Sequence, residues 1–285
     1  MTNVLGIIFA NSHEECIPEL SANRTMASIP FGGRFRLIDF HLSNMVNSGM
    51  TRVGVITKSN YQSLIDHIGS ARQWDLARTD GGLTILPPYG RTDSGLYTGK
   101  LEAIRGALGY ITKSPCEYVA ITDCNMVYNA DFLKLTEAHI ESGADITCAA
   151  VNAEFTASET ADSIIFNAGG NGRVKETIIN CARAGNYKMS LNVFLLKKQL
   201  LIDLVTDLIP KGKLNFARDI LQDMADELDI RVYDYEGYYS KISDLESYYD
   251  ANMALLDKSN LERLILMKRP IYTKVRDDAP SKYGL

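Results

Sequence analysis

Asp123 is the residue of this sequence best placed to bind a metal ion. It follows the apolar run at residues 118–122 in the stretch YVAITDCNMV, and so apolar a strand is typical of a sheet buried on both faces. A carboxylate at the carboxyl end of such a strand commonly holds Mg²⁺ against substrate phosphates. Aspartate is also a common helix N-cap and turn residue, so both roles stay open for Asp123.

The loop after the apolar run at residues 4–9 is a second place where the sequence suggests chemistry. In nucleotide-binding α/β proteins this loop usually carries glycines and cations, because it wraps phosphates. Here residues 10–30 contain no glycine, a single arginine at Arg24, and the glutamates Glu14, Glu15 and Glu19. A like charge about 4 Å from a phosphate costs roughly 1 kcal/mol in water and about 4 kcal/mol at a protein surface. The loop is therefore predicted to disfavour a triphosphate.

Three arginines near a pair of glycines form a candidate anion site. Arg34 and Arg36 lie in the stretch FGGRFR, and Arg52 follows shortly after it. A guanidinium group offers paired N–H donors that match a phosphate. The alternative is structural, with these arginines bracing a turn or pairing with Asp39, and the sequence leaves both interpretations open.

The elements that must position these residues alternate along the chain. Strands are predicted over residues 4–9, 53–57, 118–122, 146–151, 191–196 and 230–235, and helices over 38–48, 61–68, 101–110, 131–141, 198–208 and 216–227. This alternation predicts an α/β fold with right-handed crossovers and a mostly parallel sheet covered by helices on both faces. The stretch NAGGNGR at 167–173 predicts a turn between antiparallel strands, and residues 87–95 predict a mobile surface loop.

Some polar and aromatic residues are interpreted as structural. Asn44 and Asn47, in the helix predicted over 38–48, are expected to bond the backbone of neighbouring loops. A group of tyrosines is expected to pack the sheet edge or a subunit contact, with a sugar platform as the weaker alternative. Its members are Tyr233, Tyr235, Tyr238, Tyr239, Tyr248 and Tyr249.

Composition excludes several classes of function. The net charge of −5 and the pI near 5.5 argue against nucleic-acid binding. No apolar run approaches the ~20 residues of a membrane span, and no signal peptide is seen. The five cysteines form no C-x-x-C pair and the four histidines lie far apart, so neither disulfides nor a zinc site is expected. We expect a cytoplasmic protein with reduced thiols.

Residues 29–68, IPFGGRFRLIDFHLSNMVNSGMTRVGVITKSNYQSLIDHI, closely resemble the bacterial ADP-glucose pyrophosphorylases, or glucose-1-phosphate adenylyltransferases. Further matches are GGLTILPP at 81–88, NFARDIL at 215–221, LESYYDANMALL at 245–256 and RPIYT at 269–273. The resemblance covers essentially the whole chain and implies a Rossmann-like nucleotidyltransferase domain of the glycosyltransferase-A type. It implies attack of glucose 1-phosphate on the α-phosphate of ATP, with Mg²⁺ and fixed cations stabilising the charge.

The sequence departs from the motifs of active members where that chemistry is carried. The first loop lacks the glycines of G-G-x-G-x-R, and it keeps Arg24 of R-A-K-P as a remnant of the nucleotide loop without the lysine. Of the motif G-D-H only Asp123 remains, and Lys241 stands where the resemblance places the second metal-binding aspartate. The sugar-phosphate motif E-K-P is absent. No catalytic residue is therefore expected to be competent, and Asp123 is a vestigial metal ligand.

These departures resemble the GlgD-type subunit, which pairs with a catalytic GlgC-type paralogue. We expect a regulatory, non-catalytic subunit in glycogen biosynthesis that forms a hetero-oligomer and requires no cofactor, with Mg²⁺ only if residual activity exists. In the family, the basic position of Arg34 lies in a region linked to phosphorylated effectors, so Arg34, Arg36 and Arg52 are the candidate effector residues. The alternatives are a weakly active or altered sugar-phosphate nucleotidyltransferase and a stand-alone sugar-phosphate sensor.

Two parts of the chain are expected. Residues 1–258 form the nucleotidyltransferase-like domain, and residues 259–285 form a linker that leads into a second domain. In the family this second domain is a left-handed β-helix, and no hexapeptide repeat of that kind occurs in this sequence. We therefore expect this chain to be a fragment that lacks it.

Overall fold

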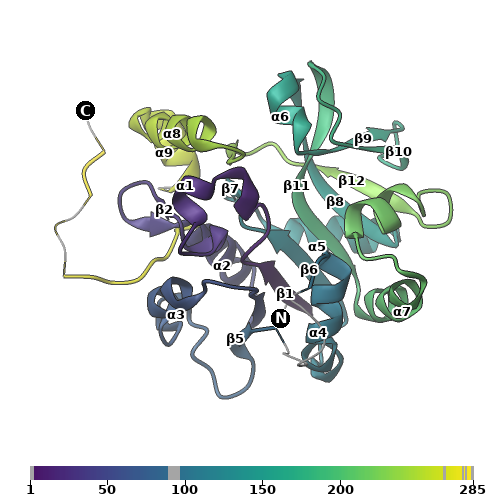
Figure 1. The fold of residues 1–285 in the computed structure, drawn as a ribbon, viewed down its shortest axis with the longest axis horizontal. Coiled ribbons are helices and arrows are strands. Elements are labelled where there is room, and N and C mark those ends of the chain that lie inside the picture. Colours follow the sequence, from purple (N-terminus) through teal and green to yellow (C-terminus); the bar gives the residue numbers. More distant parts are fainter. Residues whose placement is uncertain (1–2, 89–96, 266–267, 278, 280, 284–285) are drawn as a thin grey trace.

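The computed structural model describes residues 3–88, 97–265, 268–277, 279 and 281–283 (Figure 1). The strands are β1 (Val4–Phe9), β2 (Pro30–Phe31), β3 (Phe35–Arg36), β4 (Arg52–Ile56), β5 (Gly82–Leu86), β6 (Tyr118–Asp123), β7 (Met126–Tyr128), β8 (Ile146–Phe155), β9 (Ile164–Ala168), β10 (Val174–Ile179), β11 (Gly185–Lys197), β12 (Ile230–Asp234) and β13 (Tyr239–Lys241). The α-helices are α1 (Pro18–Ser21), α2 (Leu37–Asn47), α3 (Gln62–Ile68), α4 (Lys100–Lys113), α5 (Phe132–Ser142), α6 (Ala157–Ala161), α7 (Lys198–Leu208), α8 (Leu245–Met253) and α9 (Lys258–Leu264). Short 3₁₀ turns and one π-helical segment, Ala217–Gln222, complete these elements.

The main sheet is mixed and, within the described residues, has nine strands. Its parallel part follows the order β6–β1–β4–β5, and β12 runs parallel to β8. The long strand β11 joins these two parts, because it pairs antiparallel with β6, β8 and β9. β9 and β10 form the antiparallel pair predicted from NAGGNGR. The predicted α/β fold is thus confirmed, and β11 is the antiparallel part that strand–helix alternation does not reveal.

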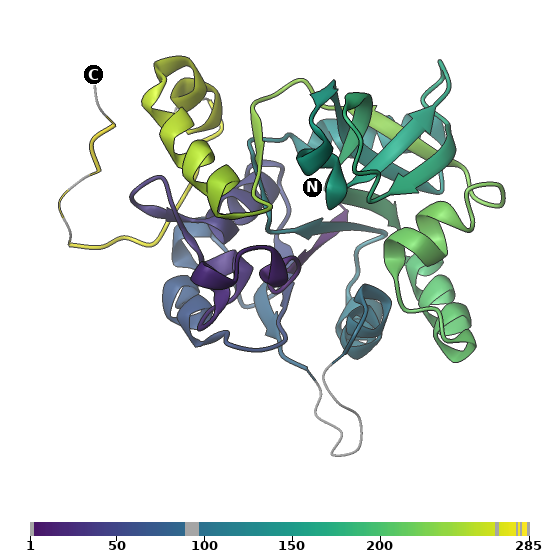
Figure 2. The same ribbon diagram turned by 45° about the horizontal axis from the view of Figure 1, so that its top comes forward.

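Helices cover both faces of this sheet, and the alternation of side chains along β1 shows why. Val4 and Ile8 point into a core shared with α2, α3 and α5, whereas Leu5, Ile7 and Phe9 point into a core shared with α4 and α7. Along one edge, α8 and α9 lie on the side of β2, while α6 lies on the opposite side with β9 and β10 (Figures 1 and 2). The first loop of the chain lies between these two groups.

Element positions agree with the sequence pattern to different degrees. β1 and α7 coincide with the predicted residues 4–9 and 198–208, and most other predicted elements differ by a few residues at their ends. β11 extends over 13 residues where only 191–196 are predicted, and the helix predicted over 216–227 is the π-helical segment. Most of the loop predicted over 87–95 lies outside the described residues.

Two adjacent glycines explain why the stretch GGLTIL begins as it does. Gly81 and Gly82 have φ of 88° and 79°, in the left-handed region that favours glycine. A Cβ atom on Gly82 would lie 2.5 Å from the carbonyl oxygen of Leu76, too close for any side chain. The pair therefore lets the chain enter β5 directly beside the segment that precedes it.

The polar residues interpreted as structural do bond the backbone of neighbouring segments. Asn44 Nδ2 donates to the Tyr128 carbonyl at 2.9 Å, and Asn47 Nδ2 donates to the Pro270 carbonyl at 2.9 Å. Five of the six tyrosines are partly buried against the core of α2 and α5, and Tyr249 is 60% exposed.

The segment after residue 258 is held against the main body. The linker predicted from residue 259 begins inside α9, whose Leu264 is fully buried. Thr273 further along donates to Asp39 Oδ2 of α2 at 2.5 Å. None of the described helices is both long and apolar enough to cross a membrane.

Candidate functional site

Asp123 is the last residue of β6, and it pairs in register with Phe9, the last residue of the parallel neighbour β1. The carboxyl ends of the two strands therefore meet at one sheet edge, where ligands bind in open α/β sheets. The Asp123 side chain is 1% exposed. A carboxylate so fully removed from water requires compensating cations or hydrogen-bond donors.

Two cations of the chain itself contact this carboxylate. Lys100, the first residue of α4, places its Nζ 2.7 Å from Asp123 Oδ2, and His13 places its Nε2 3.2 Å from the same oxygen. Burial alone would raise the pKa of Asp123, but Lys100 and His13 hold that pKa well below its usual range. The Lys100 ammonium also lies over the rings of Phe9 and Phe194. Asp123 is therefore ionised, and its negative charge is balanced by cations of the chain itself.

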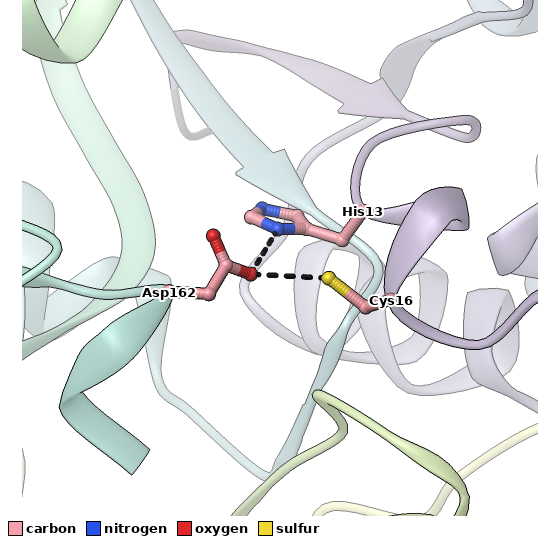
Figure 3. Close-up of side chains that lie close together, drawn as sticks. All are labelled: His13, Cys16 and Asp162. Carbon is pink, nitrogen blue, oxygen red and sulfur yellow. Dashed lines mark hydrogen bonds and ion pairs between the residues drawn. The ribbon is translucent and has the colours of Figure 1, made fainter. Parts of the chain in front are cut away.

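His13 extends this pair into a larger network (Figure 3). Its Nδ1 lies 2.9 Å from Asp162 Oδ2, and the thiol of Cys16 lies 3.3 Å from the same oxygen. Burial lowers the pKa of His13, but the contacts with Asp123, Asp162 and Cys16 together raise it well above the ordinary value. The hydrogen bond from His13 correspondingly lowers the pKa of Asp162. His13 therefore bridges two carboxylates that lie 39 positions apart in the sequence.

Lys241 contacts the same region from β13, which pairs with β7. Its Nζ donates to the Glu159 carbonyl at 3.0 Å, to Ser163 Oγ at 2.8 Å and to the Asp162 carbonyl. Burial lowers the pKa of Lys241 while the nearby Asp162 raises it, and the net shift is downward. These hydrogen bonds of Lys241 hold α6 and the segment that carries Asp162 against β13.

The first loop turns only one of its three glutamates inward. Glu15 and Glu19 are exposed, whereas Glu14 accepts a hydrogen bond from Asn11 Nδ2 at 2.5 Å. Burial raises the pKa of Glu14 to about 7. Beside Asn11 lies a cavity of about 140 Å³ that Phe9, Lys58, Tyr97 and Lys100 also line.

The candidate anion-binding arginines separate into two places. Arg34 and Arg36 line a cavity of about 330 Å³ together with Lys274 and Arg276 from the segment after α9. Burial lowers the pKa of Arg36, and the nearby guanidinium groups of Arg276 and Arg24 lower it further. This is a concentration of cations from three separate segments of the chain.

The remaining contacts of the arginines are local. Arg36 donates from Nη1 to the Ser63 carbonyl and hydroxyl at 2.6 and 2.7 Å, and its backbone N–H donates to Asp39. The Arg34 guanidinium lies over the Phe35 ring and is otherwise exposed. Arg52 is not among the residues that line this cavity. It forms an ion pair of 2.5 Å with Asp80 instead.

Comparison of the sequence with known proteins shows the family of this chain. The profile of the nucleotidyl transferase family matches residues 17–258. A glucose-1-phosphate adenylyltransferase of Thermomicrobium roseum is 34% identical over 99% of this chain, which spans 66% of that protein. Two glycogen biosynthesis proteins GlgD, from Bacillus subtilis and Geobacillus stearothermophilus, are 30% and 35% identical over 99% of this chain, which spans 71% and 72% of them. The chain belongs to the nucleotidyl transferase family.

Membership in this family confirms the resemblance drawn from the motifs. The relatives carry two kinds of name, adenylyltransferase and GlgD, and both match almost the whole of this chain. The chain itself spans about two thirds of the adenylyltransferase from Thermomicrobium roseum, at 66%. The nucleotidyl transferase domain is therefore shown, and the activity of the chain has to be argued from its site.

The family implies Mg²⁺ at the end of β6, and the residues present do not fit that ion. Mg²⁺ requires a nearly octahedral set of oxygen ligands. Asp123 Oδ2 is engaged by Lys100 and His13, and only its buried Oδ1 lacks a hydrogen-bond partner. Lys241, where the resemblance places the second carboxylate, is bonded to backbone carbonyls. We derive no catalytic step through Mg²⁺.

The other nearby aspartate does not replace the missing one. Asp244 directly precedes α8 and accepts a hydrogen bond from the Ser247 backbone N–H at 2.7 Å, which is the role of an N-cap. Of the two roles left open for Asp123, the helix N-cap is not seen among the described residues, where the carboxylate lies in a buried ion pair, and the role as a metal ligand stays a prediction.

Four residues of the network have no role in the sequence analysis. They are His13, Cys16, Lys100 and Asp162. The spacing of His13 and Cys16 in HEEC is a signal that was available, because a histidine and a cysteine three positions apart on a turn can face one ligand. Asp162 gives no such signal, since its contact with His13 joins residues 149 positions apart.

Proposed function

We propose that this chain is a GlgD-type regulatory subunit of glucose-1-phosphate adenylyltransferase in glycogen biosynthesis. Its role is to modulate a catalytic GlgC-type partner, which converts ATP and glucose 1-phosphate to ADP-glucose and pyrophosphate. The two GlgD relatives, at 30% and 35% identity over 99% of the chain, support the assignment to glycogen biosynthesis. The chain by itself has little or no activity, and it functions in a hetero-oligomer.

The observation that carries this proposal is the internal neutralisation of Asp123. Catalysis of nucleotidyl transfer rests on positioning and on cations around the phosphates. Here the cation Lys100 and the imidazole of His13 are held by the carboxylate that would otherwise hold the metal ion. An incoming Mg²⁺ would have to compete with both groups for Asp123 Oδ2, and displacement of Lys100 would leave its ammonium group, in a side chain only 19% exposed, without its carboxylate partner.

The cavity between Arg34, Arg36, Lys274 and Arg276 supports a regulatory function. Four cationic side chains around a space of about 330 Å³ suit a phosphorylated sugar, whose charge they would neutralise. Neither Asp123 nor Lys241 is among the residues that line this cavity, so a ligand bound there would act through the fold or through a partner. We propose that it binds the phosphorylated effector.

Assay of the purified chain with ATP, Mg²⁺ and glucose 1-phosphate tests the proposal. We expect no pyrophosphate release above the blank from the chain alone. The adenylyltransferase of Thermomicrobium roseum, assayed in parallel, is the positive control. Turnover by the chain comparable to that control would overturn the regulatory assignment.

A weakly active nucleotidyltransferase is the second candidate, and one observation favours it. The cavity of about 140 Å³ beside Asn11 has two lysines, Lys58 and Lys100, in its lining. Calorimetry with ATP in the absence of glucose 1-phosphate separates the two candidates. Tight ATP binding together with slow turnover would favour the enzyme, and absence of both favours the regulatory subunit. A stand-alone sugar-phosphate sensor would bind effector and show no association with a catalytic paralogue.

A further inference from the structure

One cluster of side chains next to Asp123 has the composition of a transition-metal site. His13 Nδ1, Cys16 Sγ and a carboxylate oxygen of Asp162 lie within 4.8 Å of one another, and all three side chains converge on one point (Figure 3). His13 and Cys16 come from the first loop, and Asp162 follows α6. We propose that His13, Cys16 and Asp162 bind a divalent metal ion of the zinc class.

The distances suit such an ion after a small adjustment. With bonds of about 2.0–2.3 Å to a tetrahedral Zn²⁺, neighbouring ligand atoms lie about 3.3–3.8 Å apart. The Asp162 oxygen is 2.9 Å from His13 Nδ1 and 3.3 Å from Cys16 Sγ. The Asp162 oxygen therefore has to move only a few tenths of an ångström from each of these partners, on the order of side-chain rotations. His13 Nδ1 and Cys16 Sγ, which lie within 4.8 Å of each other, have to come to the same separation of about 3.3–3.8 Å. Each contact is now bridged by a hydrogen that the metal ion would replace.

A second observation, at the other ring nitrogen of His13, also points to a metal. A histidine that ligates a metal almost always donates its other ring N–H to a carboxylate, which fixes the tautomer and raises the basicity of the ligating nitrogen. His13 Nε2 lies 3.2 Å from Asp123 Oδ2, and that carboxylate is 1% exposed and held in place by Lys100. The arrangement leaves Nδ1 as the atom that faces Cys16 and Asp162. Asp123 would thus act as a positioning residue, not as a ligand.

The charge of the cluster does not oppose the ion. A dication that binds a neutral imidazole, a thiolate and a carboxylate displaces one proton from the imidazolium and one from the thiol. Two protons leave and one dication arrives, so the net charge of the cluster does not change. Metal binding should accordingly release protons and weaken as the pH falls.

The ligand set also selects the metal and suggests what it does. Thiolate and imidazole favour Zn²⁺ or Co²⁺ over Mg²⁺, which prefers oxygen ligands. The side chains of His13 and Asp162 are 20% and 40% exposed, so a solvent molecule can complete four-coordination. A bound ion would join the first loop to the segment after α6, across the end of β6. This inference does not depend on the regulatory proposal.

Titration of the 285-residue chain with Co²⁺ and Zn²⁺ tests the site directly. We expect one ion per chain, a thiolate-to-Co²⁺ charge-transfer band, and displacement of Co²⁺ by Zn²⁺ but not by excess Mg²⁺. In Cys16→Ser the charge-transfer band should disappear, whereas Cys181→Ser, which changes the other half-exposed cysteine, should leave it intact. A wild-type chain without the band, or a band that survives Cys16→Ser, would overturn the proposal.

Two further measurements separate a ligand from a structural residue. Zn²⁺ should slow alkylation of Cys16 and leave alkylation of Cys181 unchanged in the same sample. Asp123→Asn, which alters the partner of His13 without removing a ligand, should keep the band and weaken metal affinity about 10–100-fold. Circular dichroism of each variant checks that it folds. Equal protection of both cysteines, or unchanged affinity in Asp123→Asn, would contradict the arrangement.

Discussion

A carboxylate buried at the end of β6 needs cations, and they come either from a ligand or from the chain. In this protein Lys100 and His13 supply them, so the carboxylate that the family resemblance would assign to a metal ion lies in an internal ion-pair network. The replacement is distributed over α4 and the first loop, with Lys241 fastening the segment that carries Asp162. A change at any one of these residues removes a contact from its neighbours in the network.

Removal of Lys100 should therefore destabilise the fold. In Lys100→Met the buried Asp123 keeps only His13, and loss of one partner of a buried pair costs about 3–5 kcal/mol. Urea unfolding of the variant, followed by circular dichroism, measures this difference. The matched control is Lys211→Met, because Lys211 pairs with Asp207 where both side chains are more than half exposed. The control should change stability by less than about 1 kcal/mol. Equal stability of both variants would contradict an internal role for Lys100.

His41 should make stability depend on pH. It is fully buried in α2, and burial lowers its pKa from 6.5 to about 4. Between these values the unfolded chain binds a proton that the folded chain does not, so stability falls as the pH decreases from about 6.5 to about 4. The total effect is up to about 3 kcal/mol.

The variant His41→Asn tests this dependence, because the asparagine oxygen can still accept from Thr122 and Tyr128, which now contact His41 Nδ1. The urea midpoints of the variant and the wild type are compared across the acidic range. The contribution of the carboxylates to the pH dependence is common to both proteins and cancels in the difference between their midpoints. The difference should shrink at low pH, where the wild type loses the stability due to His41. Parallel curves would show that His41 does not titrate in this way.

The turn into β5 gives a prediction about the backbone. Gly82 has φ of 79° and no room for a Cβ atom beside Leu76, so Gly82→Ala should destabilise by at least about 1–3 kcal/mol. Gly106, in the exposed face of α4, has open space at its Cβ position, and Gly106→Ala should stabilise by about 0.5–1 kcal/mol. Thermal unfolding of the two variants should shift in opposite directions. A shift of the same sign would count against this account.

The cavity formed by the β2–β3 turn and the segment after α9 gives a prediction about binding. If phosphorylated sugars bind there, Arg34→Ala should weaken binding of a sugar bisphosphate by about tenfold or more, because one charge-assisted contact is lost. Arg52→Ala is the matched control, since Arg52 pairs with Asp80 outside this cavity. Isothermal titration of wild type and both variants makes the comparison. Equal weakening in both, or in neither, would refute the assignment.

The sequence predicts the strands and helices better than it predicts the network. β1 and α7 follow directly from apolar periodicity, and the hairpin of β9 and β10 follows from NAGGNGR. Only residues 191–196 of the 13-residue strand β11 are predicted from the sequence. The rest of the strand is stabilised by pairing with distant strands, which a local pattern does not encode. The contact of His13 with Asp162 depends on the path of β8 and α6, and no local pattern encodes it.

The chain combines the architecture of the nucleotidyl transferase family with a site whose charges are satisfied internally. Under the regulatory proposal, a catalytic subunit would supply the metal site, while this chain would contribute its shape and the cavity lined by Arg34 and Arg36. Since this chain matches the adenylyltransferases and GlgD proteins over nearly its whole length, the two kinds of subunit are expected to share one domain fold. Chains that share a fold can present related surface patches to each other, as identical subunits do in a symmetric dimer.

Co-expression with a catalytic adenylyltransferase paralogue should therefore yield a complex. The two chains should co-purify, and the sugar-bisphosphate concentration that half-activates the partner should shift by about fivefold or more, within the usual range of allosteric coupling. The same experiment with Arg34→Ala should retain the complex and lose the shift, because only the effector cavity is altered. A catalytic paralogue that elutes alone with an unchanged effector response would remove the support for a regulatory subunit. A complex whose response is the same with wild type and Arg34→Ala would keep the assembly and exclude this cavity as the effector site.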